Sequence, residues 1–167
     1  MRAGLSGAAA LAALALLPAG CAGGNETDGE AEQAASADPD APEGITVSDA
    51  RMLLPPVPGN PAAIYFTIAN TSDRPVAISG ASVQGADSAM LHTTSAGPQG
   101  ASMMAEMTQQ PVPAGETVRF EPGGRHVMAS GLADTIRPGA VVEVTLTFAD
   151  GDKVSFPAAV RAPGAER

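Results

Sequence analysis

The sequence lacks several features on which common protein functions depend. It has no tryptophan. It has a single cysteine, so an internal disulfide cannot form. Nine basic residues stand against eighteen acidic ones and form no cluster, and we therefore expect no nucleic-acid binding. No nucleophile-elbow or glycine-rich phosphate motif accompanies the two histidines, so we do not expect an enzyme.

The N-terminus has no hydrophobic run of a length that spans a bilayer comfortably. Residues 3–17 contain only Ala, Leu, Gly and Ser and follow Arg2, a pattern typical of a signal peptide. The next residues, Leu17-Pro18-Ala19-Gly20-Cys21, resemble a bacterial lipobox, although Pro18 stands where that pattern prefers Leu. We predict a signal peptide over 1–20 and a lipid on Cys21 that anchors the exported protein to the outer face of the cell membrane. Ordinary secretion without the lipid is the alternative.

Much of the formal net charge of −9 comes from the segment that follows Cys21. Between residues 22 and 43 there is no basic residue and almost no large apolar side chain, so burial cannot offset the entropy of ordering. The acidic residues of this segment are Glu26, Asp28, Glu30, Glu32, Asp38, Asp40 and Glu43. We predict a disordered tether over 21–43, one folded domain over 44–162 and a short tail over 163–167.

Residues 45–159 show short β-strand patterns separated by turns, with no competing helical period. The predicted strands are 45–52, 62–70, 75–83, 89–94, 102–108, 117–120, 141–148 and 153–159. Asp150-Gly151 predicts a hairpin turn. Pro113-Ala114-Gly115 and Pro122-Gly123-Gly124 predict two further turns. We expect a single all-β domain, a Greek-key β-sandwich or barrel.

The two histidines lie close in sequence to most of the methionines. In His126-Val127-Met128 an imidazole and a thioether are two residues apart, so on an extended segment they share a face. His92 lies near the end of the predicted strand 89–94, and a methionine near 103 approaches it if the two segments pair antiparallel. Two imidazoles and two thioethers form a soft, neutral set that favours Cu(I) over zinc, calcium or magnesium. A blue-copper electron-transfer centre needs a cysteine that this domain lacks.

A metal-free interpretation is the alternative at this point. Methionines commonly fill hydrophobic cores, and a lone histidine is usually structural or solvated. The protein would then be an envelope β-sandwich that acts as a binding or scaffold module.

The order of these residues resembles the periplasmic copper chaperones of the PCu(A)C family. That family's signature is His, ten residues, Met, twenty-one residues, His, one residue and Met, with Pro-Ala-Gly and Pro-Gly-Gly turns between. The resemblance covers roughly residues 45 to 160, with Arg125 in place of the usual aromatic residue before the second histidine.

The spacing from His92 selects Met103, whereas the spacing back from His126 selects Met104. We favour Met104, because the loop at 97–100 accommodates an extra residue easily. Neighbours on a strand face opposite ways, so we do not expect both methionines to be ligands. Met107 is a third, weaker candidate.

The resemblance implies a cupredoxin-like β-barrel that carries copper and is not an enzyme. Its ligands would be His92, Met104 (or Met103), His126 and Met128, holding Cu(I), with Cu(II) as the second oxidation state considered. The partner would be a copper-accepting protein outside the cytoplasmic membrane, such as a subunit or an assembly factor of cytochrome oxidase.

Overall fold

The structure is a computed structural model that describes residues 41–165. The predicted signal peptide, Cys21 and nearly all of the predicted tether lie outside the described residues, and the boundaries 1–20, 21–43, 44–162 and 163–167 stay predictions. Within 41–165, no helix combines the length and the apolar character needed to cross a membrane.

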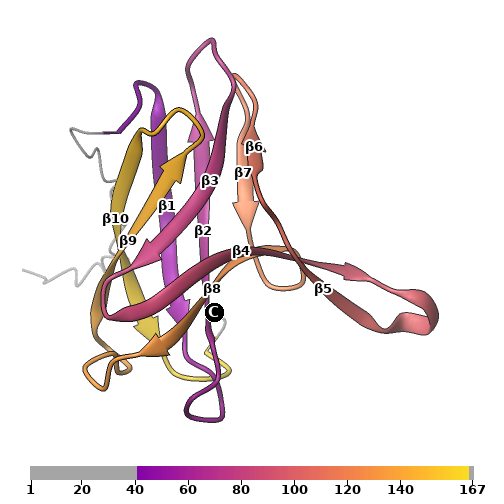
Figure 1. The fold of residues 1–167 in the computed structure, drawn as a ribbon, viewed down its shortest axis with the longest axis vertical. Helices are drawn as coiled ribbons and strands as arrows, with labels where there is room; N and C mark the ends of the chain where they lie inside the picture. The colour runs from indigo at the N-terminus through magenta and orange to yellow at the C-terminus, as the bar shows by residue number, and fades with distance from the viewer. Residues whose placement is uncertain (1–40, 166–167) are drawn as a thin grey trace, which may run out of the picture. The chain divides into compact units, whose positions relative to one another are not determined.

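Ten strands and one short 3-10 helix form the described chain (Figure 1). They are β1 (Ile45–Leu53), β2 (Ala62–Asn70), β3 (Val76–Val83), β4 (Ala86–Ala96), η1 (Pro98–Gly100), β5 (Ser102–Glu106), β6 (Gln110–Val112), β7 (Thr117–Phe120), β8 (Arg125–Leu132), β9 (Val141–Phe148) and β10 (Lys153–Arg161).

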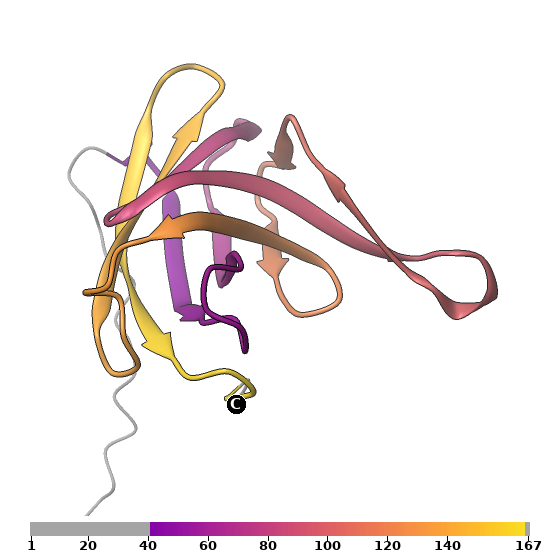
Figure 2. The same cartoon turned by 60° about the horizontal axis from the view of Figure 1, so that its bottom comes forward.

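All ten strands belong to one sheet that curls on itself. Its order is β5-β4-β8-β2-β1-β10-β9-β3-β6, and β7 pairs with the half of β2 that β8 leaves free. Only β1 and β10 run parallel among the described strand pairs. Strands β3 and β4 lie close together across the curl, and the sheet encloses its core as a barrel (Figures 1 and 2). The expected all-β, cupredoxin-like fold is confirmed.

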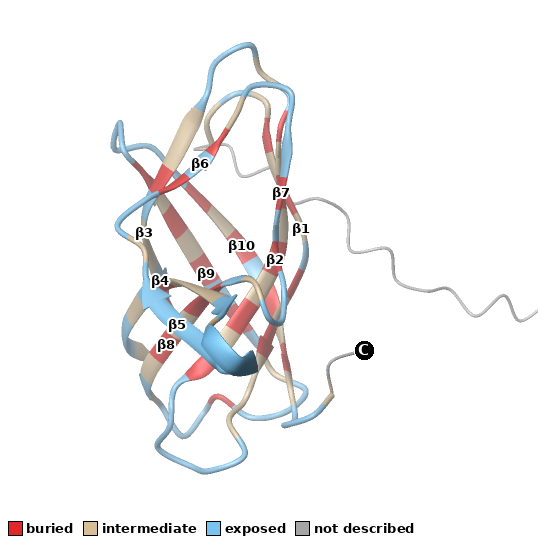
Figure 3. Cartoon of the chain, turned by 90° about the vertical axis from the view of Figure 1, so that its right-hand side faces the viewer, coloured by how far each residue is buried: buried red, intermediate tan, exposed pale blue. Residues whose placement is uncertain are grey.

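The core comes from the period-two alternation of the central strands. In β2, β9 and β10 every second residue is buried, so each strand turns one apolar row inward (Figure 3). Phe66 is stacked on Phe120 with ring centroids 4.2 Å apart and is tilted against Phe156 at 5.2 Å. Phe66, Phe120 and Phe148 are the largest fully buried side chains among the described residues, and each aromatic ring buries a large apolar area.

The predicted set of eight strands omitted two that the structure contains. These are β6 and β8. Strand β8 contains Ala129, Ser130 and Gly131 in succession, and alanine and glycine have low strand propensity. It is extended because it pairs with both β2 and β4, so tertiary contacts outweigh the local preference.

The hairpin between β4 and β5 reaches beyond the body of the barrel (Figure 2). Pairing of β4 with β8 ends at Thr93, whereas pairing with β5 continues to Ala96. We call residues 94–104 the arm. Residues 94–96 of β4 therefore pair with β5 on one edge and with no strand on the other.

Candidate metal centre

Strands β4 and β8 bring the two predicted histidine ligands together. They pair antiparallel, and His92 lies directly opposite His126. The ring centroids are 5.9 Å apart with an interplanar angle of 35°. Met128 follows His126 by two residues on the same strand, so its side chain leaves the sheet on the same face. Three of the four predicted ligands thus share one patch of sheet.

Both imidazoles present a nitrogen that has no partner. Among residues 41–165, two buried side-chain polar atoms make no hydrogen bond. They are His92 Nδ1 and His126 Nε2. Leaving such an atom unpaired costs roughly 1–3 kcal/mol, and buried polar groups are normally satisfied. A metal ion between the two rings would supply the missing partner to both.

A backbone carbonyl orients the ring of His126. Gly124 O lies 3.1 Å from His126 Nδ1, and it also accepts the Thr94 N–H at 2.9 Å. If Nδ1–H donates to this carbonyl, the neutral ring keeps a free lone pair on Nε2, the tautomer that a metal requires. The turn that places Gly124 here needs Gly123 at φ 77°, a conformation that suits glycine.

Burial keeps the imidazole of His126 neutral. Desolvation lowers its pKa below the ordinary value of 6.5; the Gly124 hydrogen bond raises the pKa, and the nearby His92 lowers it. Since a protonated imidazole cannot bind a metal, this environment leaves Nε2 available at neutral pH.

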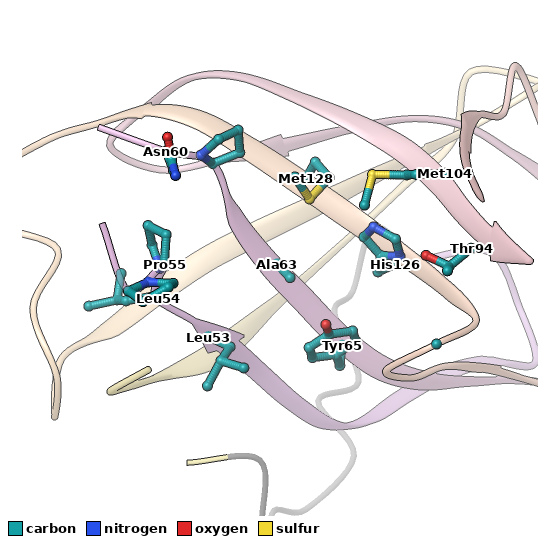
Figure 4. A pocket seen from close by; sticks show the side chains of 13 residues that line it. Leu53, Leu54, Pro55, Asn60, Ala63, Tyr65, Thr94, Met104, His126 and Met128 are labelled. Carbon is teal, nitrogen blue, oxygen red and sulfur yellow. The ribbon is translucent and has the colours of Figure 1, made fainter. Parts of the chain in front are cut away.

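The register of the arm separates Met104 from Met103. Strand β5 pairs with β4 so that Met104 lies opposite Thr94 and Met103 opposite Ser95. Thr94 is two residues from His92 and shares its face, which brings Met104 to the histidine side. Figure 4 shows Met104 pointing toward Met128 and His126. The expected antiparallel pairing of the two segments is confirmed; the residue directly opposite His92 on β5 is Glu106, and Met104 lies two residue pairs further along, opposite Thr94.

The other two methionine candidates lie elsewhere. Met103 packs over the arm's loop: a Cβ added to Gly97 would lie 2.7 Å from Met103 Cγ and 2.8 Å from its Sδ. Met107 packs against the hydrophobic core, and its N–H donates to Leu91 O at 2.8 Å. The structure brings neither to the histidine pair.

The idea that methionines fill the core is wrong for most of them. Among the described methionines only Met52 is fully buried, whereas Met90 is 46% exposed and Met103 and Met104 are each 55% exposed. An exposed thioether gains little from packing. Core filling therefore does not explain why methionines gather here.

An open pocket adjoins the site. Met104, His126 and Met128 line it together with Leu53, Leu54 and three prolines (Figure 4). His92 faces His126 but does not line this pocket. Tyr65 contributes an aromatic ring whose centroid is 6.2 Å from that of His126. Arg125, which stands at the family's aromatic position, is exposed.

The donor set limits the chemistry of the site. Within 41–165 there is no group of three or more His, Cys, Asp or Glu side chains that could hold a metal. A zinc or calcium site built on carboxylates or thiolates is therefore not formed by these residues. The chain has a cupredoxin-like fold that carries imidazole and thioether donors on one face, a donor set that suits a soft metal ion.

Comparison with known proteins agrees with this fold. A family model described as "Putative lipoprotein LpqE-like" matches residues 45–160, and the chain belongs to this family, which is of the PCuAC type. A curated relative, "Putative lipoprotein Lxx21020" of Leifsonia xyli subsp. xyli, is 33% identical over 89 residues, which are 53% of this chain and 54% of the relative. The chain thus spans about half the length of that relative.

Solved structures share the fold. The copper-bound PCuAC domain of PmoF2 matches with a TM-score of 0.60 and 26% identity, over 72% of this chain and 94% of that one. The Cu(I) form of DR1885 from Deinococcus radiodurans matches with a TM-score of 0.53 and 32% identity, over 70% and 77%. Both of these similar domains were solved with copper bound.

Sequence reasoning missed one contributor to the geometry of the site. Gly124 acts through its carbonyl, which no side-chain pattern can reveal. The structure also places Met90, two residues before His92 on β4, directly opposite Met128.

Proposed function

We propose that this protein is an extracytoplasmic copper chaperone that binds one Cu(I) ion through His92, Met104, His126 and Met128. The observation that carries the proposal is the pair of facing imidazoles, each with a buried nitrogen that lacks a partner. A relative solved with Cu(I) and another solved with copper support the choice of metal.

The donor chemistry favours Cu(I) over Cu(II). Thioether sulfur is a soft ligand that prefers Cu(I), and two neutral imidazoles add no charge. Cu(II) prefers tetragonal sites of nitrogen and oxygen donors, and Glu106 is the one carboxylate directly opposite a proposed ligand. Cu(II) is therefore the secondary oxidation state in this proposal.

The exposure of the site suits delivery to another protein. Met104 is 55% exposed and the pocket beside His126 and Met128 is open, so a ligand from a partner can reach the ion. The acceptor we propose is a copper-accepting protein such as a subunit or an assembly factor of cytochrome oxidase. Carriage of this kind involves no covalent step, so the proposed role is not enzymatic.

We also propose that the protein is an exported lipoprotein, anchored to the outer face of the cell membrane by a lipid on Cys21. The family description and the curated relative both carry the word lipoprotein, and the lipobox-like residues 17–21 support it. Labelling with a radioactive fatty acid in a bacterial host tests this. The label should be incorporated by the wild-type chain and lost in Cys21→Ala.

A Cu(I) competition titration tests the proposed function. The purified full-length chain in detergent is titrated against a chromogenic Cu(I) chelator under anaerobic conditions. We expect one equivalent of Cu(I) to be retained by the wild type and by Met103→Leu, the matched control on the other face of β5. His126→Ala should lose at least about 100-fold in Cu(I) affinity. Removing a group that only orients a metal ligand typically costs about 10–100-fold, and this substitution removes the proposed ligand itself.

The competing scaffold function predicts a different result. A metal-free β-sandwich would retain no Cu(I) against the chelator in any variant. Retention that is equal in the wild type and in His126→Ala would also overturn the proposed site. Circular dichroism of each variant checks that the fold is intact before affinities are compared.

A further inference from the structure

Two short motifs mirror each other across the β4–β8 ladder. Strand β8 carries His126 and Met128 in the order His-X-Met, and β4 carries Met90 and His92 in the order Met-X-His. Because the strands run antiparallel, the motifs meet in register: His92 lies opposite His126, and Met90 lies opposite Met128. Two imidazoles and two thioethers thus occupy four adjacent positions on one face of two strands.

The position of Met90 puts its sulfur within reach of the same ion. Directly opposite residues of an antiparallel pair have Cβ atoms roughly 4.5–5.5 Å apart, and the two-residue period places Met90 on the face of His92. Methionine is unbranched and flexible, so its sulfur can adjust to a nearby ion. Met90 is 46% exposed, so it is available and is not held by core packing.

Met90 and Met104 flank the histidine pair from opposite ends. Met90 lies two residues before His92 on β4. Thr94 lies two residues after His92 on the same strand, and Met104 lies opposite Thr94 on β5. His92, His126 and Met128 are common to both arrangements. A copper ion at the histidines can therefore be completed by either thioether.

We infer that Met90 is a further Cu(I) ligand, interchangeable with Met104, which keeps the ion coordinated when Met104 is released during transfer. The exchange replaces one Cu–S bond by another; copper stays Cu(I), and no electron or proton moves. The inference rests on the proposed function, because it needs Cu(I) at the histidine pair. It adds a ligand that the proposed four-residue site does not contain.

X-ray absorption of the Cu(I)-loaded full-length protein tests the inference by counting sulfur neighbours of copper. The variants are Met104→Leu, Met90→Leu and the double variant, with Met103→Leu as the matched exposed control. If Met90 replaces Met104, the sulfur count of Met104→Leu equals that of the wild type, and the count falls by one only in the double variant. Cu(I) affinity should fall about tenfold or less in each single variant and at least about 100-fold in the double variant, since the two thioethers substitute for each other.

Two other outcomes are distinguishable. A sulfur count that falls by one in Met104→Leu and does not change when Met90→Leu is added would overturn the role of Met90 and leave the proposed function intact. Failure of the wild type to retain Cu(I) would overturn the proposed function and the inference with it. The affinity of Met103→Leu separates a loss of ligand from a general effect of removing an exposed thioether.

Discussion

Strands β2 and β5 have opposite patterns of exposure. Every second residue of β2 is buried, and the strand has hydrogen-bonded neighbours on both edges. All five residues of β5 are exposed, and the strand lies at the end of the sheet order. Stability therefore comes from the body around β2, while β5 contributes little to the core and carries one residue of the proposed metal site, Met104.

This division explains how the residues proposed to bind copper can be exposed without weakening the core. A methionine that is not needed for packing is free to bind and release an ion, whereas Met52 in the body is fully buried and held. The histidines lie at the boundary, where β4 and β8 join the arm to the body. The following predictions test how independent the two regions are.

The largest effect is expected in the body. Phe66→Ala removes a fully buried ring that stacks on Phe120 and contacts Phe156, and should lower the free energy of unfolding by about 3–5 kcal/mol. Urea unfolding measures this change. Cu(I) affinity of the folded variant should stay within about twofold of wild type, since Phe66 lies on the core face of β2. Val141→Ala, at a position 65% exposed, is the control and should change stability by less than about 0.5 kcal/mol.

Copper should make the arm behave more like the body. Amide hydrogens of β5 should exchange faster than those of β2 without metal, because β5 is exposed and at an edge. Free Cu(I) at about 100 times its dissociation constant should raise the free energy of local opening by up to about 2.7 kcal/mol. Hydrogen exchange followed by mass spectrometry measures both. His126→Ala should show no copper-dependent change, and equal exchange of β5 with and without copper would contradict a ligand on the arm.

A pH change should act at the boundary between the regions. The folded-state pKa of His126 is below 6.5, so between that pKa and about 6.5 the unfolded chain binds more protons than the folded one. The free energy of unfolding of the metal-free protein should therefore fall as pH decreases through this window, and this loss should level off below the folded-state pKa. Urea unfolding at several pH values measures it. In His126→Gln this contribution should vanish, and an unchanged pH profile would contradict the assignment.

The smallest effect is expected in the loop of the arm. Gly97 has extended backbone angles that alanine tolerates, but an added Cβ would displace the flexible end of Met103. Gly97→Ala should therefore lower the free energy of unfolding by less than about 1 kcal/mol. Cu(I) affinity should not change, because Met104 is on the opposite face of β5. A large loss of affinity would show that the loop positions Met104.

Most of the body could be predicted from local patterns. The predicted 62–70, 117–120 and 141–148 agree with β2, β7 and β9 as observed, because alternation of buried and exposed residues is a local property that the sequence displays directly. Strand β8 could not be predicted in the same way, since its extended form depends on its partners β2 and β4. The choice between Met103 and Met104 was ambiguous for a similar reason: counting along the chain does not determine cross-strand register.

The sequence by itself determined the all-β architecture, the PCuAC-type family, and the two histidines and nearby methionines as the chemically distinctive residues. These follow from residue types and spacings, which are properties of one chain segment at a time. Only the tertiary structure decided that His92 faces His126, that Met104 shares their side of the sheet, and that Met90 meets Met128. Each of these is a pairing between segments distant in the chain, and such pairings depend on the register of the folded sheet.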